Sequence, residues 1–415
     1  MKQIYILNEK SRAIIYGIGT YIKQLTDSLV LEESFSLHIV NFNSDQKDFL
    51  FEEKDRIKYY YLPQISTNYN SQRYYRNSFF ILQPYIETKK MKDNNDLIFH
   101  FNFYQEIAFI KIIKEYYPES KIVFTIHYFN WCFLIKGNMS YFRRIIKNNP
   151  DNLIDNVEKG IAQDFQEIKK IFELTDKIVC LSKFTKQTLI KLYETPKDKI
   201  VTIYNGLKDD ATFLSKKDKI SLKTKLHIGE NEKIILFVGR LDEAKGVDIV
   251  INSFKRINQF HKDFNCRLII VGDGDYNRYI KECKDIWGKV IFTGLVNKET
   301  LYQFYQIADV GVMPSTHEQC SFVAIEMFSH GIPLIASTTT GLNEMMCTEL
   351  RYLKLKAKEM WKDTYISVEE CVNNIMLVFK QTEEEKKIMI DLSRKHYLKN
   401  YSLNKMKKKV ISLYK

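Results

Sequence analysis

The chain has 415 residues, of which 45% are hydrophobic and 27% are charged, and its formal net charge is +12. This length predicts two to three domains, and the composition is typical of a soluble globular protein. No apolar run approaches the roughly 18–20 residues of a membrane-spanning helix, and the first residues do not resemble a signal peptide. The seven cysteines include no C-x-x-C pair, which excludes a zinc framework and predicts a reduced, cytoplasmic environment.

Strand-like apolar runs alternate with helical stretches through the first half of the chain. We predict strands at residues 2–7, 36–42, 96–101, 121–127, 176–182 and 199–204. Many of these runs are continuous and β-branched, as in parallel strands that are covered on both faces. Residues 1–207 are therefore predicted to form a doubly wound α/β domain.

Two features of this first half are candidate ligand contacts. The loop after the first strand reads YGIGTYI, in which Gly17 and Gly19 allow a phosphate to approach the backbone closely. His127 ends the fourth strand and can contact a sugar or its acceptor, although a lone histidine is more often structural. The glycine loop lacks the third glycine of a dinucleotide-binding fingerprint, which excludes a nicotinamide-dependent dehydrogenase.

Two aromatic segments of the first half are candidates for a sugar-binding surface. Residues 59–80 are rich in tyrosine, and residues 141–149 combine aromatic side chains with Arg143 and Arg144. Aromatic faces stack on sugars, and arginines bind anionic groups. Packing of the tyrosines in the core is an equally weighted alternative.

The second half of the chain repeats the strand–helix rhythm. We predict strands at residues 233–239, 267–272, 289–294, 309–314 and 332–337. Residues 207–232 are polar and charged with only a short helical patch, so we place the domain boundary there and a second doubly wound domain at 208–393. Ligands of such domains bind outside the carboxyl ends of the strands, and the polar motifs of this chain follow predicted strand ends.

A cationic loop follows the first strand of the second half. In the segment FVGRLDEAKGVD, Arg240 comes directly after Gly239, and Lys245 follows five residues later. Two cations beyond a strand end can clamp a diphosphate and stabilise the charge that develops as a nucleotide leaves. The alternative is that both are ordinary surface cations.

Two glutamates with seven residues between them flank the start of another predicted helix. Glu318 lies in the loop after the strand 309–313, and Glu326 lies about one turn inside the helix. Ser321 can cap this helix, and the amides around Ser321 and Phe322 suit a diphosphate. A carboxylate suits a sugar diol, so Glu326 is a candidate for binding sugar hydroxyls. A structural acid near a helix N-terminus is the alternative.

The E-x7-E pattern and the G-R-L-x-x-x-K-G segment together resemble retaining GT-B glycosyltransferases of the family-4 type, the glycosyl transferases group 1. The resemblance covers nearly the whole chain and is strongest over residues 233–346. It implies two Rossmann-like domains that face a central cleft. It also implies a nucleotide-sugar donor, expected to be a UDP-sugar, and a hydroxyl acceptor on a glycan, a lipid-linked intermediate or a peptide. Neither a cofactor nor a metal is implied.

The resemblance also implies a role for each candidate residue. Gly17 and Gly19 would approach the donor phosphate, and His127 would contact the sugar or acceptor. The first domain would receive the acceptor, which makes its two aromatic segments a candidate acceptor surface. Arg240 and Lys245 would stabilise the leaving phosphate, which takes the acceptor proton in a front-face mechanism. The remaining donor contacts are Glu318 near the sugar and phosphate, Glu326 at the ribose, Gly239, Ser321 and Phe322 at the phosphates, and the backbone of Leu295 and Val296 at the base. The D-x-D of residues 273–275 resembles the family's G-D-G turn rather than a metal site.

The chain departs from the family's pattern between the two glutamates. Where E-G-F-G is common, this sequence reads Glu318-Gln319-Cys320-Ser321, so the detailed phosphate and sugar contacts are expected to differ. A nucleotide-sugar-binding protein without transferase activity is therefore the alternative function. The loop variants resemble a Bacteroidetes-type subgroup that is partly associated with peptide modification.

The end of the chain is strongly basic. Residues 394–415 contain one arginine, seven lysines and no acid, and residues 403, 406, 410, 413 and 414 form an apolar stripe at helical spacing. We predict an amphipathic helix over 394–415 that packs back on the N-terminal domain with its lysines in solvent. Peripheral contact with an anionic membrane at its inner face is the alternative. Nucleic acid is not an expected partner, because no recognition motif accompanies the charge.

Overall fold

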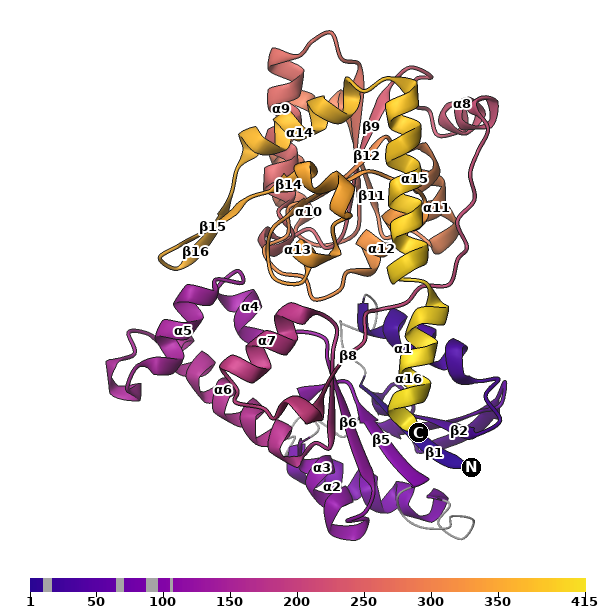
Figure 1. Ribbon diagram of the computed structural model, residues 1–415, viewed down its shortest axis with the longest axis vertical. Coiled ribbons are helices and arrows are strands. Elements are labelled where there is room, and N and C mark those ends of the chain that lie inside the picture. Colours follow the sequence, from indigo (N-terminus) through magenta and orange to yellow (C-terminus); the bar gives the residue numbers. More distant parts are fainter. Residues whose placement is uncertain (10–16, 65–70, 87–95, 105–106) are drawn as a thin grey trace. The chain divides into compact units, whose positions relative to one another are not determined.

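The computed structural model describes residues 1–9, 17–64, 71–86, 96–104 and 107–415 (Figure 1). Tyr16 of the glycine loop and residues 65–70 of the tyrosine-rich segment lie outside this part of the chain. The chain forms two compact units. Unit 1 comprises Met1–Phe129, Ile145–Gly206 and Leu403–Lys415, and unit 2 comprises Asn130–Arg144 and Leu207–Ser402.

An eight-stranded sheet forms the centre of unit 1, in the order β3-β4-β2-β1-β5-β6-β7-β8. The strands are β1 (Lys2–Glu9), β2 (Phe35–Ser44), β3 (Leu50–Lys54), β4 (Ile57–Pro63), β5 (Leu97–Phe101), β6 (Lys121–Ile126), β7 (Lys177–Cys180) and β8 (Ile200–Thr202). All neighbours pair in parallel except β3 and β4, which form an antiparallel hairpin at the sheet edge. The strand order reverses between β1 and β5, so ligand-binding loops are expected after these two strands.

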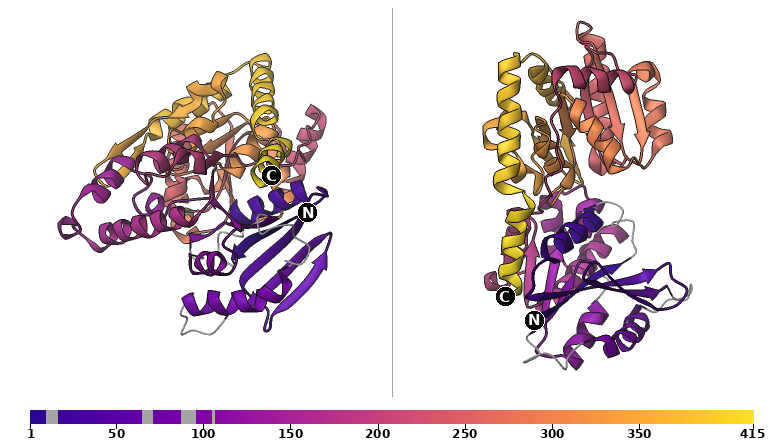
Figure 2. Two further views of the ribbon diagram at one scale, coloured as in Figure 1. Left: turned by 60° about the horizontal axis from the view of Figure 1, so that its bottom comes forward. Right: turned by 90° about the vertical axis from the view of Figure 1, so that its right-hand side faces the viewer.

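Helices cover both faces of this sheet (Figure 2). They are α1 (Gly17–Leu29), α2 (Ser71–Leu82), α3 (Ile107–Tyr116), α6 (Asn156–Leu174), α7 (Lys183–Lys191) and α16 (Leu403–Tyr414). On one face, Tyr21 of α1 and Tyr414 of α16 contact His100 of β5. On the other face, Tyr75 of α2 and Phe109 of α3 pack on Phe42 of β2.

Three of the five described tyrosines of the segment 59–80 lie in this core, and the other two are half-buried. Tyr60, Tyr74 and Tyr75 are at most 3% exposed. Their burial follows the core-packing alternative rather than the acceptor-surface hypothesis.

Unit 2 is built on a six-stranded, all-parallel sheet in the order β11-β10-β9-β12-β13-β14. The strands are β9 (Lys233–Val238), β10 (Cys266–Val271), β11 (Val290–Gly294), β12 (Val310–Met313), β13 (Leu334–Ser337) and β14 (Lys354–Leu355). Numbered within the unit, this order is 3-2-1-4-5-6, the doubly wound arrangement with its reversal between β9 and β12. Both predicted doubly wound α/β domains are thus present.

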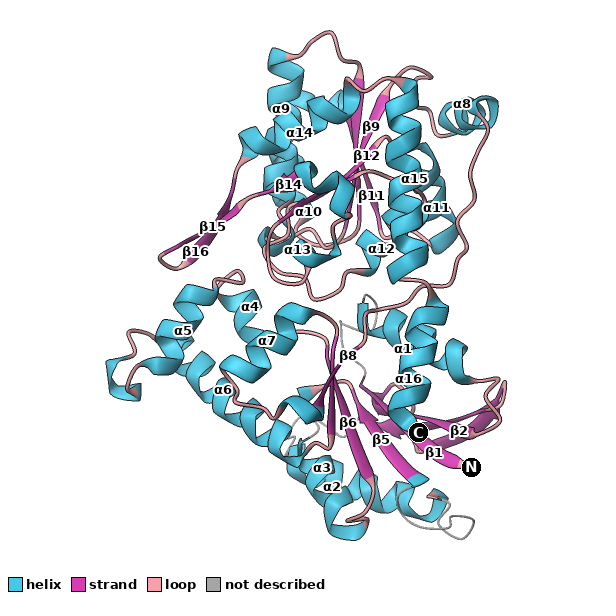
Figure 3. Ribbon diagram, viewed as in Figure 1, coloured by secondary structure: helices cyan, strands magenta, loops and turns pink. Residues whose placement is uncertain are grey.

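Helices also flank the sheet of unit 2 on both sides (Figure 3). They are α8 (Lys216–Lys225), α9 (Val247–Phe260), α10 (Tyr276–Glu282), α11 (Lys298–Ile307), α12 (Phe322–Ser329), α13 (Leu342–Met345), α14 (Val368–Phe379) and α15 (Glu383–Asn400). A separate antiparallel hairpin consists of β15 (Ala357–Met360) and β16 (Asp363–Ile366). The helix α4 (Asn130–Leu134) and the first part of α5 (Met139–Lys147) also belong to this unit.

The hairpin holds the segment 130–144 in unit 2. The Asn138 side-chain amide donates to the carbonyl oxygens of Met360 at 2.7 Å and Asp363 at 2.9 Å. The Glu359 carboxylate accepts from the backbone N–H groups of Met139 at 2.9 Å and Ser140 at 3.1 Å. A carboxylate at a helix N-terminus satisfies amides that lack partners within the helix. Residues 130–144 therefore belong to unit 2, although they lie before the boundary that we predicted at residue 207.

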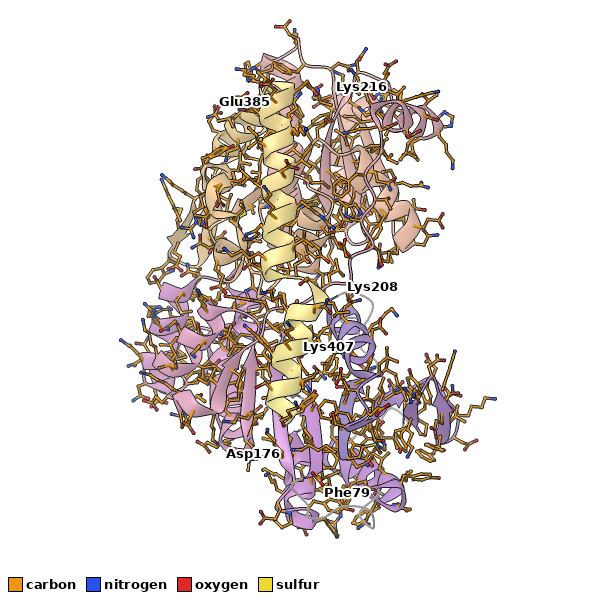
Figure 4. The ribbon with its side chains drawn as sticks, turned by 45° about the vertical axis from the view of Figure 1, so that its right-hand side comes forward. Phe79, Asp176, Lys208, Lys216, Glu385 and Lys407 are labelled. Atoms are coloured by element: carbon orange, nitrogen blue, oxygen red, sulfur yellow. The ribbon has the colours of Figure 1, made fainter. Side chains whose placement is uncertain are left out.

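The C-terminal segment forms two helices, where the sequence predicted one over 394–415. Arg394 lies inside α15 and pairs with Asp209, so residues 394–402 belong to unit 2. The later helix, α16, packs in unit 1 as predicted, with Met406 and Val410 at most 2% exposed. Lys407, labelled in Figure 4, lies on the polar side of α16 and pairs with Glu32 at 2.6 Å. No described helix is long and apolar enough to cross a membrane.

Replacing Met406 by alanine should destabilise the protein by about 2–5 kcal/mol, because a buried methionine side chain is removed from a packed interface. Lys408→Ala on the exposed side of the same helix is the control, and its effect should stay within about 0.5 kcal/mol. Denaturant unfolding of both variants measures the difference. Equal stability of the two variants would show that α16 is not packed through its apolar stripe.

Candidate active site

Two loops meet at the carboxyl ends of the neighbouring strands β9 and β12, where the strand order of unit 2 reverses. The first loop follows β9 and contains Arg240 and Lys245. The second follows β12 and leads to α12. The Thr316 N–H of the second loop donates to the Ala244 carbonyl oxygen at 2.8 Å. Gly246 has a φ of 71°, and a Cβ there would lie 2.5 Å from the Pro314 carbonyl oxygen, so only glycine allows this close approach.

The structure brings Lys245 and Glu318 into contact at this edge. The Lys245 Nζ lies 2.6 Å from the Glu318 Oε1, and the two side chains are only 22% and 12% exposed. Glu318 is held through its backbone, because the Thr340 hydroxyl accepts from the Glu318 N–H at 2.9 Å and donates to its carbonyl oxygen at 2.7 Å. A cation and a carboxylate that the sequence predicted separately therefore form one charged pair.

Arg240 lies in the same loop, and Asp242 organises both cations. The Asp242 carboxylate pairs with the Arg240 guanidinium at 3.0 Å and accepts from the Lys245 backbone N–H at 2.9 Å. The Arg240 guanidinium also lies over the Phe133 ring, 5.7 Å from its centroid. About a third of the Arg240 side chain remains exposed. The loop thus presents two cations whose positions are supported by neighbouring side chains.

Phe133 and His317 are site residues that sequence reasoning did not identify. The Phe133 ring meets the His317 ring edge to face at 5.6 Å. Burial lowers the pKa of His317 to about 3, and the nearby Lys245 adds to this effect. His317 is therefore neutral near pH 7 and adds no charge beside the Lys245–Glu318 pair. No short motif could reveal this contact, because Phe133 lies far earlier in the sequence.

The loop between the two glutamates is accommodated in the interior of unit 2. Gln319 and Cys320 are 4% and 5% exposed. The Gln319 carbonyl oxygen passes so close to Gly341 that a Cβ there would lie 1.9 Å away. Ser321 caps α12 by accepting from the Ala324 N–H at 3.4 Å, and Phe322 is the first residue of the helix. The side chains that stand where the family has glycines are therefore buried, and α12 begins with a serine cap.

Glu326 lies one turn inside α12, as the sequence predicted, and is partly buried. The Tyr305 hydroxyl of α11 donates to the Glu326 Oε2 at 2.8 Å. Burial raises the pKa of Glu326 to about 7, although the hydrogen bond from Tyr305 and the charge of Lys298 act in the opposite direction. This carboxyl group therefore changes its charge near neutral pH.

The D-x-D sequence forms a turn that supports the cationic loop. The Leu241 N–H donates to the Asp273 carbonyl oxygen at 2.9 Å, and the Asp275 N–H donates to the Leu241 carbonyl oxygen at 3.0 Å. A Cβ at Gly272 would lie 1.9 Å from the Gly239 carbonyl oxygen. The described residues include no group of three or more His, Cys, Asp or Glu side chains that could hold a metal ion.

The loop after β11 contains the two residues predicted to present backbone to a base. Leu295 is 57% exposed and Val296 is half-buried. The next residue, Asn297, caps α11 by accepting from the Thr300 N–H at 2.9 Å. The backbone of this loop is therefore held by the start of α11.

The candidates of unit 1 lie after β1 and β6. The helix α1 begins at Gly17 and contains Gly19, and a Cβ at Gly17 would meet no heavy atom within 4 Å. His127 follows β6, and its Nε2 lies 2.9 Å from the Asn102 Oδ1. Burial lowers the pKa of His127 to about 3, with the neighbouring His100 adding to the effect. A neutral imidazole that donates from Nε2 keeps an acceptor at Nδ1.

Of the two arginines considered for the acceptor, Arg144 is engaged within unit 2. Its guanidinium lies 4.8 Å from the centroid of the Tyr141 ring and 5.0 Å from that of Trp361. Arg143 is exposed. Arg143 is therefore the more accessible of the two cations.

Comparison with known proteins places this geometry in a family. A family model described as "Glycosyl transferases group 1" matches residues 218–396, and one described as "Glycosyltransferase Family 4" matches residues 15–211. The uncharacterized glycosyltransferase MJ1607 of Methanocaldococcus jannaschii is 35% identical over 42% of this chain, which corresponds to 45% of that protein. The lipopolysaccharide 1,2-N-acetylglucosaminetransferase of Salmonella typhimurium is 24% identical over 68% of this chain and 76% of that protein.

Solved structures share the fold over the whole chain. Sucrose-phosphate synthase from Thermosynechococcus elongatus superposes with a TM-score of 0.74 at 16% identity, covering 100% of this chain and 98% of that one. Anabaena HepE in complex with UDP and glucose superposes with a TM-score of 0.68 at 13% identity, covering 100% and 99%. The chain therefore belongs to the group 1, family-4 type of glycosyltransferases, a family of enzymes, and has their GT-B fold.

Proposed function

We propose that this protein transfers a sugar from a nucleotide-sugar donor to a hydroxyl group, with retention of the anomeric configuration. The observation that carries the proposal is the contact between Lys245 and Glu318 at 2.6 Å, in the loop that also holds Arg240. The donor is proposed to be a UDP-sugar, in line with the UDP and glucose bound by the structurally similar HepE. The acceptor is proposed to be a glycan, a lipid-linked intermediate or a peptide.

The charged groups of unit 2 suit the departure of a nucleoside diphosphate. In the proposed reaction the acceptor oxygen bonds to the anomeric carbon as the bond from that carbon to the phosphate oxygen breaks on the same face. The acceptor proton passes to the leaving phosphate oxygen. Arg240 and Lys245 would stabilise the negative charge that develops there. Glu318 holds the Lys245 ammonium in place beforehand, which reduces the reorganisation needed when the donor binds.

We assign the remaining candidate residues to different groups of the donor. Glu326, ionised, would accept hydrogen bonds from the two ribose hydroxyls, with Tyr305 fixing one of its oxygens at 2.8 Å. His127 would offer Nδ1 to a sugar hydroxyl, since its Nε2 faces Asn102. Gly17 would allow the backbone at the start of α1 to approach the phosphates.

The alternative function, a nucleotide-sugar-binding protein without transferase activity, is less well supported. That alternative rested on the bulk of Gln319 and Cys320, and both side chains are buried within unit 2. This chain has the features expected of the diphosphate site: the Lys245–Glu318 pair, Arg240 and the capped helix α12. Family membership and these contacts favour a transferase.

Replacing Arg240 or Lys245 by alanine should reduce turnover at saturating donor by roughly 10²–10³-fold, because each cation stabilises charge that develops only as the bond breaks. Nucleotide affinity should fall less than turnover does. Lys255→Ala is the control, since Lys255 lies on α9 and pairs loosely with Asp285 at 3.9 Å. Near-parental turnover in either test variant would remove that residue from the proposed clamp.

The affinity for UDP should rise with pH between pH 6 and pH 8. With a pKa of about 7, the ionised fraction of Glu326 grows roughly ten-fold over this interval. Only the ionised carboxylate accepts from both ribose hydroxyls. Calorimetric titrations of the parent and of Glu326→Gln across this range separate the effect from titration of UDP itself. Identical pH profiles for the two proteins would contradict the ribose assignment.

Activity should be unchanged in EDTA, because both acids of the D-x-D sequence have local partners. Asp273 accepts from the Gly274 N–H at 2.8 Å, and Asp275 caps α10. The measurement is sugar transfer or donor hydrolysis with and without EDTA, followed by addition of manganese or magnesium. Loss of activity that either metal restores would overturn the turn assignment.

A further inference from the structure

A chain of buried hydrogen bonds links the C-terminal helix α16 to α1 on one face of the unit 1 sheet. The Tyr414 hydroxyl of α16 bonds to the His100 Nδ1, and the His100 Nε2 lies 2.6 Å from the Thr125 hydroxyl of β6. The Thr125 hydroxyl in turn lies 3.1 Å from the Tyr21 hydroxyl of α1. All four side chains are at most 1% exposed.

Every member of this chain is uncharged near neutral pH. Burial lowers the pKa of His100 to about 3 and raises the pKa values of Tyr21 and Tyr414 above their usual range. Each hydroxyl and each ring nitrogen has a partner, and the donors can align in one direction along the chain. In a low-dielectric interior, removing one link leaves a buried polar atom without a partner. The position of each member therefore depends on its neighbours.

The hydrogen-bond chain ends at Tyr21, which contacts His127 and lies near the start of α1. The Tyr21 ring meets the His127 ring edge to face, with 4.6 Å between their centroids. His127 is held on its other side by Asn102, whose amide donates to the Leu7 carbonyl oxygen at 3.0 Å. Tyr21 also lies one turn after Gly17, at the start of α1. One hydroxyl contact, from Thr125 to Tyr21, thus bears on both the His127 ring and the start of α1.

We propose that Tyr414 is a positioning residue for the donor site. Through His100, Thr125 and Tyr21 it fixes the orientation of the His127 imidazole and the start of α1. The C-terminal helix would then act on the reaction from the far end of the sequence, without touching the sugar. The proposal rests on the proposed function of His127 and Gly17 in donor binding.

The test compares two buried tyrosines. Tyr414→Phe removes the hydroxyl that bonds to His100. Tyr397→Phe removes a hydroxyl that donates to the Leu207 carbonyl oxygen at 2.9 Å in unit 2, away from this chain of hydrogen bonds. The readout is the pair of ring nitrogen resonances of His127, Nδ1 and Nε2, in protein labelled with ¹⁵N-histidine. They are assigned by the loss of that pair of signals in His127→Ala. The protein has only eight histidines, so the spectrum is simple.

Tyr414→Phe should shift the His127 resonances, and Tyr397→Phe should leave them in place. Turnover of UDP-sugars should fall roughly ten-fold in Tyr414→Phe, because both the His127 ring and the phosphate-binding start of α1 lose a support. Thr125→Val breaks the same chain from its centre and should behave like Tyr414→Phe. Thr125→Ser keeps the hydroxyl and should retain the parental signals.

Unchanged His127 resonances in both Tyr414→Phe and Thr125→Val would overturn the proposal, whatever their stability. Failure of the proposed function is distinguishable, because His127→Ala would then keep full turnover. The resonances would still report whether Tyr414 and His127 are coupled. If Tyr414→Phe does not fold, the Thr125 pair gives the same comparison.

Discussion

The close approach of two loops at the carboxyl ends of β9 and β12 is the constraint on which the candidate site depends. The loops that follow parallel strands all lie at the carboxyl edge of the sheet. Where the strand order reverses, the two neighbouring loops diverge and leave a space between them. Here the loops are joined by the bond from the Thr316 N–H to the Ala244 carbonyl oxygen and by the tight passage of Gly246 past Pro314. The charged pair of Lys245 and Glu318 follows from this approach.

Under the proposed function, the charged pair has an energetic consequence for catalysis. Two opposite charges in a partly buried place lose hydration, which their mutual attraction must offset. A site of this kind holds its charges in fixed positions before the donor binds. Preorganised charge of this sort stabilises a transition state more effectively than mobile water does. The interaction between Arg240, Phe133 and Asp242 extends the same preorganisation to the second cation.

Much of the fold could be predicted from the sequence because most strands are continuous β-branched runs. The strands β3 and β4 were not predicted. The residues of β3, LFEEK, are all exposed and mostly polar, and β4 overlaps the tyrosine-rich segment considered for sugar binding. The placement of segment 130–144 in unit 2 was not predicted either. It depends on hydrogen bonds from Asn138 to Met360 and Asp363, which lie more than 200 positions later in the sequence. Burial patterns in a sequence carry no information on such partners.

The individual site candidates could likewise be predicted from motifs, whereas their contacts could not. Lys245 and Glu318 were identified separately, but they are 73 positions apart and their pairing is a property of the fold. Tyr305 and His317 escaped notice because a tyrosine in a helix and a histidine in a loop carry no local signal. The roles assigned to these residues in donor binding stay predictions.

Amide hydrogen exchange with and without a nucleoside diphosphate tests the central claim most directly. The protein would be incubated separately with UDP, GDP and ADP at concentrations that saturate binding in calorimetry. If the donor phosphates bind between the β9 and β12 loops, the bound nucleotide should slow exchange in residues 239–247 and 314–326. Binding of any of the three with unchanged exchange in both segments would contradict the account.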